Sequence, residues 1–308
     1  MFSKKLLIPL LSLSLLVTPA YSSHAAENAE AAGTSIEGQG MLSPSSSSEN
    51  SESVFNGSGA GTSSEPVTDE KLETILKQVQ SQLPAENGTW AVFISDLVNG
   101  TEGSLNDQKM QAASLIKLYI MGAVYENYDQ ITGQYGRDSV DSNLYSMITV
   151  SDNDAANTLT TYLGGGDSAA GMQAVNSFCQ AHGYDQTHMG RMLLASNEND
   201  DNYTSVGDCG HLLQEIYKQD TSGYTHATDM FNLLKAQTRC NKIPAQLPEG
   251  VKTANKTGEL DNVENDAGII YDSKNDVVIV FMSQNLSSAG SAQNTIATLS
   301  RTIYDYYN

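Results

Sequence analysis

The sequence predicts an α/β protein in which a single antiparallel sheet packs beside a block of helices. Strand patterns occur near both ends of the folded region, at 90–98 and within 251–284, and the long interval between them has helical patterns. Further helical patterns flank the strands at 68–83 and 291–307. Strands that lie far apart in one domain complete a shared sheet, so both ends of this region are expected to contribute to it.

The first expected elements are a helix at 68–83 and a β-hairpin. Thr68 suits the N-cap position of this helix. Its apolar residues recur at helical spacing: Leu72, Ile75, Leu76, Val79 and Leu83. The hairpin has a strand at 90–98, a turn at Asn99-Gly100 and a second, short strand.

Helical patterns continue along the middle of the chain. The expected helices span 114–125, 143–163, 170–182, 206–219 and 228–239, and Gly164-Gly165-Gly166 ends the second of them. Strands are then expected at 251–255, 267–272 and 276–284, the last two forming a hairpin around 273–275. A helix at 291–307 follows them, and no repeat period is present.

The N-terminal residues resemble an export signal. Two lysines at 4–5 precede an apolar run at 6–20, and Ser23-His24-Ala25 is a small-residue cleavage site, so 1–25 is predicted to be a secretory signal peptide. An uncleaved anchor is the alternative, although the apolar run is short for a membrane span. Residues 26–66 are rich in Ser, Gly, Glu and Ala and are expected to form a disordered linker. The folded domain is expected at 67–308.

Charge and cysteine content limit the possible binding partners, disulfides and cofactors. The net charge of −20 argues against binding to nucleic acid or to an anionic membrane, and a solvated acidic surface explains it. Three cysteines (Cys179, Cys209 and Cys240) leave one disulfide with one free thiol as a possibility. No Cys-x-x-Cys or paired-histidine spacing predicts a metal, so neither a metal nor another cofactor is expected.

The first chemical motif is Ser114-x-x-Lys117, in an apolar helical segment. Residues three apart on a helix are neighbours, so the Lys117 amine is expected beside the Ser114 hydroxyl. Burial and a second nearby cation both lower a lysine pKa. A neutral Lys117 would accept the serine proton and thereby activate a nucleophile, whereas an isolated match of this kind indicates only a solvated helix face.

The second motif is Ser151-Asp152-Asn153, which alone would indicate a turn or a helix cap. Beside the first motif, Ser151 is expected to pass a proton to a leaving nitrogen, and Asn153 to donate to a substrate amide carbonyl. Asp152 is expected to point inward and fix the loop.

The third motif, Lys256-Thr257-Gly258, follows a predicted strand. Lys256 would supply positive potential, Thr257 a hydroxyl for a substrate carboxylate, and Gly258 room for close approach. The backbone N–H groups of Glu259 and Ser114 are expected to form an oxyanion hole, where each donor is typically worth about 3 kcal/mol.

In this order the three motifs resemble the signature of class A β-lactamases and penicillin-binding proteins. The resemblance extends from about 67 to the C-terminus and implies a β-lactamase/transpeptidase-like fold, in which the serine lies between a sheet subdomain and an all-helical subdomain. It implies the family roles for six residues: Ser114, Lys117, Ser151, Asn153, Lys256 and Thr257.

The chain departs from that family pattern in three places. Aligning Arg191 and Asn197 with the family's Arg and Asn places Leu193 where class A enzymes have a Glu that orients the deacylating water, and the acidic stretch 198–201 is a candidate substitute. The two motif serines are only 37 positions apart (151 − 114), so one wall of the cleft is expected to be trimmed. The segment 265–268 lacks the arginine with which many relatives bind the substrate carboxylate. Lys242 is either a replacement or an ordinary surface lysine.

The resemblance therefore predicts a serine hydrolase that is acylated at Ser114 by a β-lactam or a peptidoglycan-derived amide and then hydrolyses the acyl-enzyme. A D,D-peptidase or esterase, and a binding module with slow or no turnover, are the alternatives. The protein is expected to be monomeric and to be secreted or associated with the cell wall, with no membrane span after signal removal.

Overall fold

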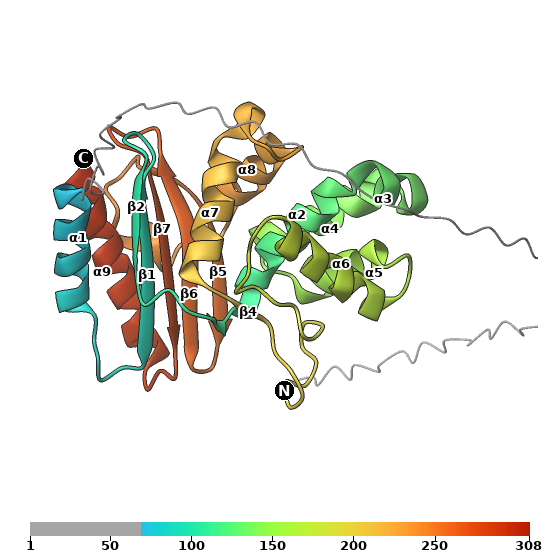
Figure 1. Cartoon of the computed structure of the whole chain (residues 1–308), viewed down its shortest axis with the longest axis horizontal. Coiled ribbons are helices and arrows are strands. Elements are labelled where there is room, and N and C mark those ends of the chain that lie inside the picture. Colours follow the sequence, from blue (N-terminus) through green and yellow to red (C-terminus); the bar gives the residue numbers. More distant parts are fainter. Residues whose placement is uncertain (1–68) are drawn as a thin grey trace, which may run out of the picture. The chain divides into compact units, whose positions relative to one another are not determined.

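The computed structural model describes residues 69–308 (Figure 1). The predicted signal peptide at 1–25 and the predicted linker at 26–66 lie outside the described residues. Those described belong to one structural unit, Ser63–Asn308.

The centre of the described region is a five-stranded antiparallel sheet with the order β2-β1-β7-β6-β5. Its strands are β1 Thr89–Asp96, β2 Thr101–Leu105, β5 Lys252–Leu260, β6 Val263–Tyr271 and β7 Val277–Gln284. Strand β1 pairs with β7 from Thr89↔Gln284 to Asp96↔Val277. The two ends of the domain therefore share one sheet, as the sequence predicts.

Nine α-helices and three 3₁₀ turns accompany the sheet within residues 69–308. The helices are α1 Glu70–Gln82, α2 Ile116–Glu126, α3 Tyr128–Tyr135, α4 Arg137–Thr149, α5 Asn153–Leu163, α6 Ser168–Ala181, α7 Val206–Tyr217, α8 Ala227–Lys235 and α9 Ala289–Tyr307. The 3₁₀ turns are η1 Ala113–Leu115, η2 Gln219–Thr221 and η3 Ile243–Gln246, and a two-residue pair, β3 Met110–Gln111 with β4 Tyr203–Thr204, forms a second small sheet.

The helices form layers on the sheet and a separate block beside it (Figure 1). Helices α1 and α9 cover one face, α7 and α8 lie on the other side, and α2 to α6 form the block. Strand β7 is buried along nearly its whole length because both faces are covered, which explains its almost continuous apolar sequence. Two apolar cores result, one on each side of the sheet.

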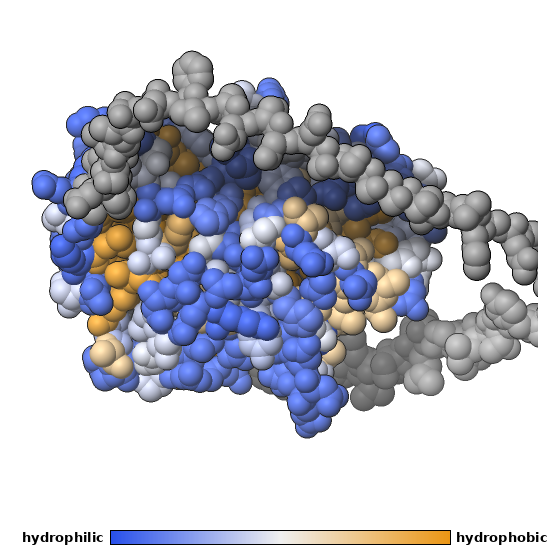
Figure 2. Space-filling model, viewed as in Figure 1, coloured by the Kyte–Doolittle hydropathy of each residue, from blue (hydrophilic) through white to orange (hydrophobic). Residues whose placement is uncertain are grey.

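The surface outside these cores is mostly polar. Figure 2 shows a predominantly hydrophilic face with smaller apolar areas, in keeping with the acidic composition. Cys179, Cys209 and Cys240 are all free thiols, so the possible disulfide is not formed. Within residues 69–308, none of the helices combines the length and apolar character needed to cross a bilayer.

The structure corrects several predicted boundaries. The single helix expected at 143–163 is two helices, α4 and α5, because Ser151 adopts a left-handed φ of 62° between them. Helix α3 and the β3–β4 pair were not predicted. Strand β5 continues to Leu260, so the third motif lies inside a strand, and β6 begins at Val263 rather than at 267. These strand extensions were not predicted because they contain polar residues. Tertiary contacts bury those residues, and sequence periodicity does not reveal such contacts.

Candidate active site

Ser114 lies in η1, at the entrance to the central helix α2. Ten of the eleven α2 residues are buried, so the surrounding helices pack against this helix on all sides. Lys117 belongs to that buried set, although it is charged in its ordinary state. Ser114 itself is only partly buried and lines a cavity of about 240 Å³.

The Lys117 amine contacts both motif serines. Its Nζ lies 3.2 Å from Ser114 Oγ and 3.2 Å from Ser151 Oγ. It also donates to the Ser151 carbonyl at 2.6 Å and to Asn153 Oδ1 at 2.7 Å. The two oxygen acceptors therefore take two hydrogens of the Lys117 amine. In a neutral amine the remaining site is the nitrogen lone pair, which faces the Ser114 and Ser151 hydroxyl groups.

Burial lowers the pKa of Lys117 from 10.5 to about 7. The Asp152 carboxylate opposes this shift, while the positive charge of Arg239 adds to it. At neutral pH a large fraction of Lys117 is therefore unprotonated and able to accept the Ser114 proton.

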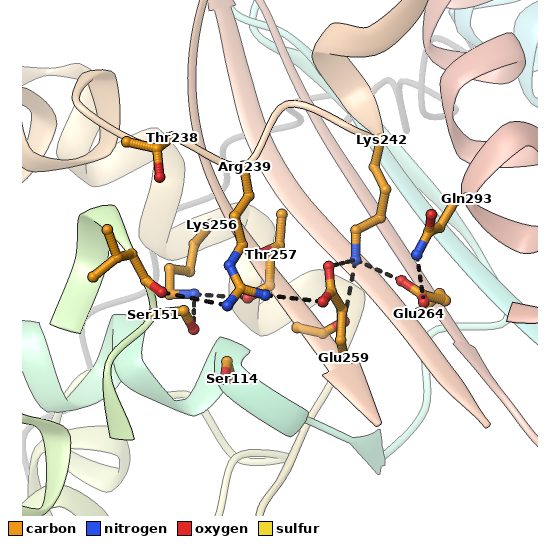
Figure 3. Close-up of polar contacts among 12 residues, drawn as sticks. Ser114, Ser151, Thr238, Arg239, Lys242, Lys256, Thr257, Glu259, Glu264 and Gln293 are labelled. Atoms are coloured by element: carbon orange, nitrogen blue, oxygen red, sulfur yellow. Dashed lines mark hydrogen bonds and ion pairs between the residues drawn. The ribbon is translucent and has the colours of Figure 1, made fainter. Parts of the chain in front are cut away.

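Ser151 joins the first motif to the third. Its Oγ accepts a hydrogen bond from Lys256 Nζ at 2.8 Å, and Lys117 Nζ lies 3.2 Å away on the other side. Lys256 is fully buried, and its Nζ also donates to the Thr257 carbonyl at 2.7 Å. Burial holds the Lys256 pKa well below its ordinary value, with further lowering by Lys117 and Arg239. The three motifs thus converge on one hydroxyl. Figure 3 shows its contact with Lys256.

The break between α4 and α5 presents Ser151 and Asn153 to this site. Asp152 is the N-cap of α5 and accepts from the Ala155 N–H at 2.8 Å. The prediction that Asp152 points inward is wrong, because Asp152 is exposed to solvent. It nevertheless fixes the loop, because a capped helix start anchors the turn that precedes it.

Strand β5 is the edge strand of the main sheet and runs beside η1. A Cβ on Gly258 would lie 2.9 Å from the Ala112 carbonyl and 3.2 Å from the Ser114 nitrogen, so only glycine permits this approach. The backbone of β5 therefore lies close to the backbone of Ser114, where the oxyanion hole of Glu259 and Ser114 N–H groups is predicted. Thr257 Oγ1 is buried and has no hydrogen-bond partner among the described residues.

The loop after α6 forms the other wall of the cavity. Leu193, Leu194 and Arg191 line it together with Asn153. Asn157 holds the Leu193 backbone in both directions, accepting from its N–H at 2.8 Å and donating to its carbonyl at 3.0 Å. An aliphatic side chain is therefore fixed where the resemblance implies a water-orienting Glu.

The acidic stretch at 198–201 does not supply that carboxylate at the cavity. Asp200 contacts His188 at 2.7 Å, and Asp201 pairs with Arg191 at 2.7 Å. Among the described residues that line the cavity, Glu259 is the one carboxylate.

Sequence reasoning gave the wrong environment for Lys242 and missed Arg239. Lys242 is fully buried and pairs with Glu264 at 2.7 Å, so it is neither a surface lysine nor free to bind a substrate carboxylate. Arg239 donates to Glu259 at 2.9 Å beside Lys256 (Figure 3). Arg239 lies between α8 and η3, and no spacing rule connected it to the motifs.

A larger cavity of about 440 Å³ lies between α3, α4 and α8, and none of the motif residues lines it. The convergence of the motifs, rather than cavity size, therefore identifies the candidate active site.

The fold and the site together define the β-lactamase-like class of serine hydrolases. A family model described as the beta-lactamase enzyme family matches residues 71–138 and 134–307, and the chain belongs to this family. A search of curated proteins finds no match.

Solved structures share the fold at low sequence identity. A β-lactamase from Sphaerobacter thermophilus is 22% identical with a TM-score of 0.64, covering 75% of this chain and 96% of its own. A protein named PBP-A is also 22% identical, with a TM-score of 0.66 and coverages of 76% and 96%. An ancestral class A β-lactamase is 19% identical, with a TM-score of 0.63 and coverages of 77% and 99%. These comparisons establish the β-lactamase/transpeptidase-like fold.

Proposed function

We propose that this protein is an exported serine hydrolase of class A type that forms an acyl-enzyme at Ser114 with β-lactams or peptidoglycan-derived amides. The observation that supports this most strongly is the continuous polar path from Ser114 Oγ through Lys117 Nζ and Ser151 Oγ to Lys256 Nζ. Family membership independently favours β-lactams as the substrate class.

Acylation begins at Ser114. Neutral Lys117 accepts the hydroxyl proton as the oxygen attacks the lactam carbonyl. The N–H groups of Ser114 and Glu259 stabilise the negative charge that develops on the carbonyl oxygen. The carbonyl carbon–nitrogen bond then breaks, and the ring nitrogen requires a proton.

Ser151 delivers that proton. Its hydroxyl lies between Lys117, which holds the proton taken from Ser114, and Lys256. A transfer from Lys117 to Ser151 and from Ser151 to the leaving nitrogen restores neutral Lys117. Lys256 orients the hydroxyl by donating to it, and Asn153 and Thr257 are the proposed contacts for the substrate amide and carboxylate.

Deacylation is expected to be slow. An acyl-enzyme is hydrolysed by a water that a general base activates, and the loop places Leu193 where that base is expected. This observation favours the second candidate, a penicillin-binding protein that retains its acyl group, over rapid β-lactam hydrolysis.

The test is incubation with benzylpenicillin followed by intact-mass spectrometry. A mass increase equal to one penicillin, located at Ser114 and absent in Ser114→Ala, supports the proposal. The lifetime of the adduct then separates a hydrolase from a penicillin-binding protein. No adduct in folded wild-type protein would rule out both β-lactam functions.

Export is proposed from the N-terminal residues. Expression of the full chain in a bacterial host should yield extracellular or wall-associated protein that lacks about 25 N-terminal residues by mass. Retention of the intact chain in the cytoplasm would contradict it.

A further inference from the structure

A series of alternating charges runs from α9 to the active site along β5 and β6. Gln293 donates to Glu264, which pairs with Lys242; Lys242 pairs with Glu259, and Glu259 with Arg239 (Figure 3). We call Glu264, Lys242, Glu259 and Arg239 the charge ladder.

The sheet register explains why the ladder has this form. Glu259 and Glu264 are directly opposite each other on β5 and β6. Like charges at facing positions repel, and here Lys242 lies 3.1 Å from the first carboxylate and 2.7 Å from the second. One buried ammonium thus serves two carboxylates, and the second oxygen of Glu259 remains for Arg239.

The charge ladder carries no net charge, because its two carboxylates balance its two cations. The Arg239 guanidinium, at the exposed end, is therefore already neutralised by Glu259. Burial opposes ionisation of Glu259, but Lys242 and Arg239 outweigh it and hold its pKa below the ordinary value. Glu259 therefore remains a carboxylate across the neutral range.

Glu259, and not Arg239, lines the cavity that contains Ser114. The cation that does line the cavity, Arg191, is held by Asp201 at 2.7 Å and by the Ala195 carbonyl at 3.1 Å. Both arginines at the site are thus already paired. A substrate carboxylate that approached Arg239 would have to compete with a resident one.

We propose that Glu259 is a specificity-determining residue: by occupying Arg239 it reduces the advantage that a carboxylate beside the scissile amide gives a substrate over an uncharged one. This inference rests on the proposed function, because it concerns the substrate of the same serine. Replacement of Glu259 by glutamine leaves Lys242 paired with Glu264 and frees the Arg239 charge for an incoming anion.

The first experiment compares benzylpenicillin with its methyl ester. The second-order rate constant for acylation of Ser114 is measured by intact-mass spectrometry in wild type and Glu259→Gln. Glutamine should raise the rate for the acid about fivefold more than the rate for the ester, the scale of one partly exposed ion pair. The ester corrects for the effect of Glu259 on the oxyanion, which both substrates share.

Three variants sharpen the comparison. Glu249→Gln changes net charge equally at an exposed position seven residues before Lys256, and it should leave the acid-to-ester ratio unchanged. Glu259→Ala makes the same charge change with a different side chain and should repeat the increase. In an Arg239→Gln background the Glu259→Gln effect should disappear, since coupled residues are not additive. An equal change for acid and ester, or an increase that persists without Arg239, would overturn the inference.

A binding titration, which needs no acylation, tests the inference even if no β-lactam acylates the protein. Phenylacetate and phenylacetamide are titrated into isotope-labelled protein, and amide chemical shifts of β5 are followed. Glu259→Gln should bind phenylacetate about fivefold more tightly and phenylacetamide unchanged. Unchanged phenylacetate affinity would refute the inference, whereas failure of acylation alone refutes only the proposed function.

Discussion

At the scale of single residues, the proposed chemistry depends on a lysine that the fold shields from solvent. Lys117 loses hydration in the core of the helical block. The backbone carbonyl of Ser151 and the side-chain amide oxygen of Asn153 accept hydrogen bonds from its amine, and no carboxylate is directly bonded to it. Because desolvation outweighs the attraction of Asp152, its pKa falls to about 7. A surface lysine with the same sequence neighbours would remain protonated.

Lys117→Met should slow acylation of Ser114 by roughly 10²- to 10⁴-fold, the usual contribution of a general base. In the wild type the acylation rate should rise with pH and reach half its maximum near pH 7, because unprotonated Lys117 is the active form. Stopped-flow acylation across pH 5–9 measures both effects. The exposed Lys77→Met is the control, and unchanged acylation in Lys117→Met would exclude its role as base.

Leu193→Glu should shorten the lifetime of the acyl-enzyme at least tenfold, because it adds a carboxylate at the cavity wall where water must be activated. Mass spectrometry after removal of excess penicillin gives the lifetime. Val98→Glu is the matched control, since this residue is 60% exposed and does not line the cavity. Equal lifetimes in folded Leu193→Glu and wild type would argue against this position for the base.

At the scale of secondary-structure elements, two local features assemble the site. The left-handed Ser151 separates α4 from α5 and turns its own hydroxyl toward both lysines. The edge strand β5 then approaches η1 closely at Gly258. Ser151 lies between regular elements and Gly258 lies inside β5, and both hold backbone groups where the proposed reaction needs them.

Gly258→Ala should reduce acylation about 10²- to 10³-fold, the cost of losing an oxyanion-hole donor. The added methyl group would press on the Ala112 carbonyl and the Ser114 nitrogen and push β5 away from η1. Gly133→Ala is the control, because a Cβ there meets nothing within 4 Å. Benzylpenicillin acylation rates and circular dichroism together test this; full activity in Gly258→Ala would mean that β5 tolerates the shift.

Lys242→Met should lower the free energy of unfolding by about 3 kcal/mol, because it leaves Glu264 buried without its cation. The double variant Lys242→Met with Glu264→Gln should recover much of that loss, since the uncompensated charge is gone. Urea unfolding at pH 7 measures both. A double variant no more stable than Lys242→Met would show that the ion pair is not the cause.

At the scale of the whole molecule, pairing of β1 with β7 joins the two ends of the domain and holds the third motif against the helical block. The sheet and the block thus enclose Lys117 and Lys256, both fully buried. Burial that lowers their pKa values favours the proposed catalysis but opposes stability, because the unfolded chain binds those protons more tightly.

The free energy of unfolding should therefore rise with pH between about 7 and 10.5 through the Lys117 contribution. Over that interval the unfolded state keeps the proton that the folded state has released, with a slope of up to about 1.4 kcal/mol per pH unit for one group. Lys117→Met should remove this contribution. The free energy of unfolding of the wild type, relative to that of the variant, should therefore rise from pH 7 to pH 9. Urea unfolding at both values measures the difference, and parallel profiles would contradict the shift.

The sequence by itself determined the α/β class, the sheet shared by both ends and the motif residues Ser114, Lys117, Ser151 and Lys256. Apolar periodicity and motif spacing are local properties that can be read along the chain. Their roles remain predictions until activity is measured.

Tertiary structure decided what local patterns do not contain. The break at Ser151, the buried pairing of Lys242 with Glu264, and the contact of Arg239 with Glu259 depend on segments that meet only after folding. The charge state of a lysine or carboxylate is set by the surfaces packed around it. Motif spacing indicated the candidate catalytic groups, and packing determined which of them lost solvent and which charges were paired.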